Sequence, residues 1–167
     1  MGLIMLLLCC CSRQQEKKFE SMTFDETKLP TELVKIDDKI VSAWSNKLDT
    51  NYFEYFEFKH LDGQFNPIVI KVSGDDYSAL RLLTFDDNER LISDYEISGG
   101  PCGGPTELED KIEFCPSRIS RMTSPTTFLV KTIQEFYEDW DDSKPSEVDS
   151  TQWKIEIDQH GQIVVVR

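Results

Sequence analysis

The feature that most constrains this fold is a series of short apolar segments separated by turn signals, running from residue 52 to the C-terminus. Asp62-Gly63, the tetrapeptides at 73–76 and 86–89, and Gly161 all favour turns between strands. The segments between them have the length of strands. They cover residues 52–61, 67–72, 77–85, 90–97, 117–122, 126–137, 151–158 and 162–167.

Alternation of apolar and polar residues inside these segments indicates strands with one buried face. Trp153, Ile155 and Ile157 alternate with polar residues, and a period of two places them on the same face of a sheet. We therefore predict an antiparallel meander of seven or eight strands. The sheet must curl or fold over to bury its apolar face, and barrel-like and sandwich arrangements both satisfy that requirement.

A helical period precedes the strands. From Pro30 onward, apolar residues recur at spacings of three, four and seven, which predicts one amphipathic helix ending at residues 47–51. These residues are Leu33, Ile36, Ile40, Val41 and Trp44. The predicted fold class is therefore α+β and mainly β, with residues 30–167 forming a single globular domain.

The N-terminal residues, MGLIMLLLCCCS, have the composition of an export signal. The apolar run from Leu3 to Cys11 is less than half of the roughly 20 residues that a membrane-spanning helix needs. It matches the short apolar core of a signal peptide, although no basic residue precedes Arg13. Residues 12–29 are polar and have no sustained period, so we interpret them as a flexible tether.

The stretch Leu8-Cys9-Cys10-Cys11-Ser12 resembles the lipobox of bacterial lipoproteins, in which a cysteine receives a diacylglycerol group. Residues 1–11 then form the signal, and Cys11 is the expected acceptor because polar sequence follows it directly. Cys10 is the alternative acceptor. The resemblance implies an exported protein held by acyl chains in the cell envelope, at an outer membrane or on a periplasmic face.

The order of elements from residue 30 also resembles a group of small uncharacterised lipoproteins of Bacteroidetes-type bacteria. The likeness lies in the predicted helix, the aromatic segment after it, and the stretches LLTFDDNERLISDYEI and WKIEIDQHGQIVV. It implies no catalytic residues.

Charge limits the class of partner. The chain has 18 Lys and Arg against 31 Asp and Glu, a formal net charge of −13. Nucleic acid and anionic lipid head groups require clustered positive charge and are therefore disfavoured. An acidic chain suits a basic partner, or gains only solubility from its charge.

Two cysteines remain outside the signal, Cys102 and Cys115. Their spacing does not fit a CxxC redox or zinc motif, and in an oxidising compartment we expect them to form a disulfide bond. The loop SGGPCGGP at 98–105 is expected to be a stiff connection, because Pro101 and Pro105 remove amides that a phosphate site would use.

No residue pattern indicates a cofactor, a metal site or an enzyme. His60 and His160 each lie beside a glycine turn, where a hairpin tip is the simpler interpretation. The acidic stretch at 138–149 lacks the DxDxDG order of a calcium loop and is expected to be an exposed loop.

The favoured function is a lipid-anchored binding module that displays aromatic residues to a protein or a glycan. Four residues are candidates for that display: Tyr52, Tyr55, Phe56 and Trp140. The chain could instead be an immunity-type inhibitor of a basic toxin, since strong negative charge would speed its association. A small envelope hydrolase that uses paired carboxylates and a purely structural lipoprotein are also compatible with the sequence.

Overall fold

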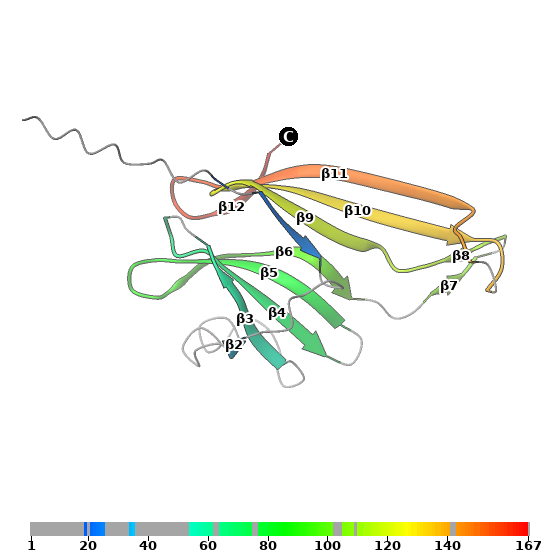
Figure 1. Cartoon of the computed structure of the whole chain (residues 1–167), viewed down its shortest axis with the longest axis horizontal. Helices are drawn as coiled ribbons and strands as arrows, with labels where there is room; N and C mark the ends of the chain where they lie inside the picture. Colours follow the sequence, from blue (N-terminus) through cyan, green and yellow to red (C-terminus); the bar gives the residue numbers. More distant parts are fainter. Residues whose placement is uncertain are drawn as a thin grey trace, which may run out of the picture.

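The computed structural model describes residues 19, 21–25, 34–35, 54–61, 64–74, 77–101, 105–108, 110–140 and 143–166. Within these ranges the regular elements are strands, arranged in two antiparallel sheets that lie against each other over part of their length (Figure 1). The mainly β prediction is confirmed. The two sheets do not close into a barrel within the described part of the chain.

The larger sheet, sheet A, is a meander completed by an N-terminal strand. Its order is β1 (Met22–Asp25), β9 (Ser117–Ser124), β10 (Thr127–Tyr137), β11 (Glu147–Ile157) and β12 (Ile163–Val166). The two-residue strands β7 (Thr106–Glu107) and β8 (Ile112–Glu113) pair with each other, and β8 also pairs with the end of β10.

The smaller sheet, sheet B, follows the order of the sequence throughout. It contains β2 (Val34–Lys35), β3 (Glu54–His60), β4 (Ile68–Gly74), β5 (Tyr77–Phe85) and β6 (Leu91–Pro101). Each predicted segment therefore contains a strand, but the single predicted meander is divided into two sheets between β6 and β9. The division follows from burial, because two facing sheets cover each other's apolar side chains.

The shared core lies where the sheets face each other. Its members from sheet A are Phe24, Met122, Phe128, Val130, Ile155 and Ile157, and those from sheet B and the loop after β3 are Leu61, Val69, Leu80, Leu82 and Ile97. Phe24 and Phe128 are fully buried, with ring centroids 6.0 Å apart. Burial of each such side chain contributes about 1.5–3 kcal/mol. The strand alternation noted above places Ile155 and Ile157 in this core.

Polar contacts also join the sheets. The Trp153 indole N–H donates to the Tyr95 hydroxyl over 2.9 Å, and the Thr84 hydroxyl donates to the Gly161 carbonyl over 2.6 Å. Arg118 of β9 pairs with Glu96 of β6. The facing sheets are thus fixed by hydrogen bonds and an ion pair as well as by apolar packing.

The opposite face of sheet B is buried too. Ile70, Val72, Ala79 and Leu83 are at most 1% exposed, yet they do not belong to the core between the sheets. Burial on both faces explains why β4 and β5 are almost continuously apolar instead of alternating.

Two hairpins use the same turn. After β5, Asp86 Oδ1 accepts the amide N–H groups of Asn88 and Arg90, each over 2.9 Å. After β11, Asp158 Oδ1 accepts the corresponding groups of His160 and Gln162 over 2.8 and 2.9 Å. The local side-chain oxygen thus fixes both turns, as turn-forming aspartates do.

Three predictions at element boundaries need correction or fall outside the description. Ser98–Pro101 belong to β6 and not to a connecting loop, because Gly99 has φ 75° and its missing side chain lets β5 approach. A Cβ there would lie 2.2 Å from the Ser78 carbonyl oxygen. Val34–Lys35, predicted helical, form β2, and the rest of the predicted helix lies outside the described residues.

The predicted tether at 12–29 contains a strand. Met22–Asp25 form β1, pair with β9, and bury Phe24 in the core. Four residues are too few to show a period, so the sequence alone did not distinguish this strand from polar tether. An unstructured connection to the anchor could extend only as far as Ser21.

Candidate functional site

The candidate site lies at the far end of sheet A. Strands β10 and β11 are both longer than the shared core, and Figure 1 shows them continuing beyond sheet B to β7 and β8. We call residues 105–114 and 135–140 at this end the tip. It is a part of the sheet that sheet B does not cover, which leaves its side chains available to a partner.

The tip is held by pairing at the end of β10. Phe136 pairs with Glu113, and Tyr137 pairs with Ile112. The side chain of Ile112 is 4% exposed. Just beyond β8, the Phe114 ring lies 4.7 Å from that of Tyr137 and 6.4 Å from that of Trp140. These aromatic contacts fix where Trp140 sits.

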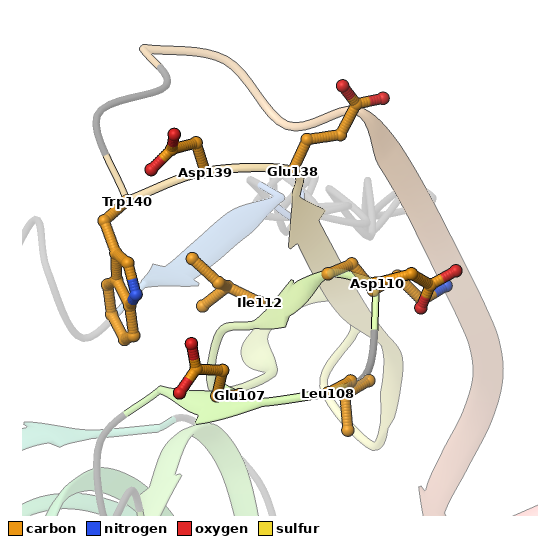
Figure 2. A pocket seen from close by; sticks show the side chains of 8 residues that line it. Glu107, Leu108, Asp110, Ile112, Glu138, Asp139 and Trp140 are labelled. Atoms are coloured by element: carbon orange, nitrogen blue, oxygen red, sulfur yellow. The ribbon is translucent and has the colours of Figure 1, made fainter.

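A cavity of about 290 Å³ opens beside Trp140. It is lined by Glu107, Leu108, Asp110, Lys111, Ile112, Glu138, Asp139 and Trp140. Figure 2 shows the Trp140 indole and the Glu107 carboxylate on the same side of Ile112, with the Glu138 carboxylate directed away. Trp140 is 54% exposed although it contacts Phe114, so much of its surface remains open to a ligand.

Negative charge dominates the cavity. The described lining contains four carboxyl groups, those of Glu107, Asp110, Glu138 and Asp139, and one cation, Lys111. Its ammonium lies 2.7 Å from the Glu147 carboxylate and 4.1 Å from the centroid of the Phe136 ring.

The hydrogen bond to Glu147 raises the pKa of Lys111 above its ordinary value. This lysine therefore stays charged and already has a carboxylate partner. Burial, reinforced by a hydrogen bond to Glu135 over 3.1 Å, raises the pKa of the nearby Tyr137 hydroxyl, so this group stays neutral near neutral pH.

Of the aromatic residues predicted to face a partner, Trp140 lines the cavity. Tyr55 and Phe56 belong to β3 in sheet B, and their side chains are not among those described. Tyr52 lies outside the described residues. The structure therefore places Trp140 at the tip and the strand residues Tyr55 and Phe56 in sheet B.

Cys115 is half-buried and disulfide-bonded. Its predicted partner, Cys102, lies outside the described residues, so the pairing of these two cysteines stays a prediction. The predicted lipid acceptors Cys10 and Cys11 also lie outside that part of the chain.

The two histidines lie apart from the tip. His60 is the last residue of β3, and His160 lies in the exposed turn between β11 and β12, as predicted. Among the residues that the structure describes, no cluster of three or more His, Cys, Asp or Glu is placed to hold a metal ion. The acidic stretch at 138–149 is only partly a loop, because β11 begins at Glu147.

Sequence reasoning missed the β7–β8 half of the cavity. Glu107, Leu108, Asp110 and Ile112 lie in or between two-residue strands, which are too short to produce a recognisable period. The pairing of β8 with the end of β10 brings them beside Trp140, and that pairing spans more than twenty residues of sequence.

Comparisons with protein-family models, curated proteins and solved structures found no match to this chain. A search of the described residues found no helix that is both long enough and apolar enough to span a membrane.

Proposed function

We propose that this chain is a binding module of the cell envelope, held by an N-terminal lipid, whose tip cavity receives a positively charged group of its partner. The observation that carries the proposal is the exposed indole of Trp140 beside an acidic cavity. A cavity of about 290 Å³ has the size for a single side chain or sugar ring, at the lower end of ligand pockets of roughly 300–1,000 Å³.

The chemistry of the lining favours a cation over a neutral ligand. The face of an indole attracts ammonium and guanidinium groups, and the gain increases when the cation is partly desolvated. The carboxylate of Glu107 lies on the same side of Ile112 as the indole, as Figure 2 shows. Lys111 does not offset this charge because it is paired with Glu147.

Two classes of partner carry such a group: a basic protein and an amino sugar. The net charge of −13 would speed the approach of either one at low ionic strength. An immunity-type inhibitor of a basic toxin is the special case in which the partner is a basic protein.

The test is a titration of the ¹⁵N-labelled chain with three probes, followed by the indole N–H resonance of Trp140 and, in variants that lack this residue, by the amide resonances of Leu108 and Ile112 in the cavity lining. The probes are an arginine- and lysine-containing peptide, a glucosamine oligosaccharide and its N-acetylated, neutral form. We expect the cationic probes to shift the Trp140 resonance, with binding that weakens as salt is added, and the neutral form to leave it unchanged.

Variants assign the binding to the cavity. Trp140→Ala should abolish binding, whereas Trp140→Phe should keep part of it because a ring remains. Val165→Ala removes another exposed apolar side chain, 51% exposed and in β12, and should have no effect. Equal binding of charged and neutral probes, or unchanged binding by Trp140→Ala, would disprove the proposal.

A further inference from the structure

Strand β11 has an unpaired edge. On one side it pairs with β10 from Glu147 to Glu156 of β11, but on the other side β12 pairs only with Lys154–Ile157. Among the described strands, none covers the edge from Glu147 to Trp153. An open edge of this length has room for another strand, since strands commonly have five or six residues.

The direction of the main-chain groups follows from one hydrogen bond. The amide of Ile157 donates to the Thr126 carbonyl, which lies at the start of β10. Main-chain groups alternate in direction along a strand. Odd-numbered residues of β11 therefore face β10, and the N–H and C=O groups of Val148, Ser150 and Gln152 face the open edge.

These edge residues are exposed, and Val148 is exposed by 55%. The edge-facing amide of Ser150 donates to the carboxylate of the adjacent Asp149 over 2.7 Å. An acidic side chain on an open edge discourages unspecific strand pairing. Here it also makes pairing conditional, because an incoming strand must displace that carboxylate from the Ser150 amide.

We propose that this edge binds an extended, positively charged segment of another protein as an additional strand, end to end with β12. Strand addition to an open edge supplies affinity through main-chain hydrogen bonds and specificity through alternate side chains. A lysine or arginine opposite Asp149 gives the displaced carboxylate a new partner, whereas a neutral or acidic strand does not.

Charge complementarity decides between this partner and a second copy of the chain. Pairing of two copies through the same edge would bring together two Glu147 and two Asp149 side chains from chains with net charge −13. A basic segment meets no such repulsion. The edge begins at Glu147, which pairs with Lys111 of the tip, but this proposal does not require the proposed function to be correct.

The probe is a seven-residue peptide with blocked ends, Lys-Val-Lys-Val-Lys-Val-Lys, which can place lysines on the face of Asp149. Its binding to the full-length, ¹⁵N-labelled chain is measured through the amide resonances of Val148 and Gln152, which report on the edge and not on the tip cavity. Two control peptides accompany it: one has glutamate in place of lysine, and the other has the same charge but N-methyl groups on alternate residues. We expect only the unmodified lysine peptide to bind, because the N-methyl groups remove the main-chain donors.

Variants of the edge give the second comparison. Ser150→Pro removes an edge-facing N–H without removing a bond to β10 and should weaken binding by about tenfold. Ser150→Ala removes only the hydroxyl and should bind as the wild type does. Asp149→Asn should reduce the preference for lysine over glutamate peptides at the edge.

Three results would overturn the proposal. The first is equal binding of the N-methylated peptide, which would indicate attraction by charge alone. The second is wild-type binding by Ser150→Pro. The third is dimerisation of the chain through this edge, detected by sedimentation and abolished by Ser150→Pro. If Ser150→Pro fails to fold, the N-methylated peptide decides the question.

Discussion

Glu89 and Gly161 occupy the same position in the two matching turns. Each is the third residue after the aspartate that fixes its turn. Both have positive φ, 59° for Glu89 and 79° for Gly161. A left-handed backbone is unfavourable for residues with a side chain and favourable for glycine. The two turns thus contain the same left-handed backbone conformation, once in a residue with a side chain and once in a glycine.

We predict opposite effects of exchange at these positions. Gly161→Ala should lower the free energy of unfolding by about 1–3 kcal/mol, because φ is positive and the added carbon would crowd its surroundings. A Cβ there would lie 2.8 Å from both Ile92 Cδ1 and Phe65 Cγ. Glu89→Gly should leave stability unchanged or raise it. Urea denaturation measures both, and a loss of stability in both variants would contradict the prediction.

Local chemistry explains which residues could be predicted. The turn roles of Asp86 and Gly161 follow from their own backbone preferences and need no distant partner. The sequence indicates Trp140 as a candidate for display to a partner, and its side chain is 54% exposed. The identity of its neighbours across the cavity depends on pairing between β8 and β10, and no local signal carries that information.

At the scale of elements, the hairpin of β5 and β6 has a built-in dependence on pH. Hydrogen bonds from the Arg90 amide and guanidinium hold the pKa of Asp86 below its ordinary value of 3.8. Because the folded state favours the carboxylate, this group stabilises the fold above its unfolded pKa. That contribution disappears as the pH falls through the lower, folded value.

We therefore expect Asp86→Asn to flatten the acid side of the stability profile. The variant keeps an oxygen acceptor in the turn but does not titrate, so its urea midpoint should change less than that of the wild type between about pH 6 and about pH 2.5. Asp87→Asn is the matched control, since it removes the same charge from an exposed neighbouring residue. Parallel profiles for Asp86→Asn and the wild type would argue against the turn as the source.

The strands themselves were predictable where they are long and bounded by turn residues, as in β4, β5 and β11. The short strands β1, β7 and β8 were not, because a period needs more residues to become visible. The four-residue β12 was predicted because an apolar run follows the turn at Gly161. The division into two sheets was also not encoded locally. It depends on which apolar faces meet, and Phe24 of β1 joins Phe128 of β10 across a long sequence separation.

At the scale of the whole molecule, the lipid anchor is the prediction with the largest effect on function. Replacing Cys11 by Ala should release the folded chain from membranes, because Leu3–Cys11 is too short to span a bilayer without acyl chains. Detergent phase separation measures the partition. If Cys11→Ala stays in the detergent phase and Cys10→Ala does not, Cys10 is the acceptor.

If replacement of Cys9, Cys10 and Cys11 together leaves the chain in the detergent phase, the lipoprotein interpretation is wrong.

The position of β1 limits how far the domain can lie from the anchor. Only residues 12–21 separate Cys11 from the first strand, and even fully extended they reach at most about 35 Å. An anchored chain would therefore hold sheet A close to the membrane surface.

The pairing of β1 with β9 also has a consequence for the order of folding. Ser21 and Met122, joined by a hydrogen bond, are 101 residues apart in the sequence. The hairpins of β9 to β12 can form from neighbouring residues, whereas β1 must close a loop of about that length, at an entropic cost that delays it. During synthesis at about 5–20 residues per second, β1 exists for several seconds before its partner strand has been made. Phe24 is therefore exposed longest and buried late, which makes the first strand the part of this chain that most needs protection before folding is complete.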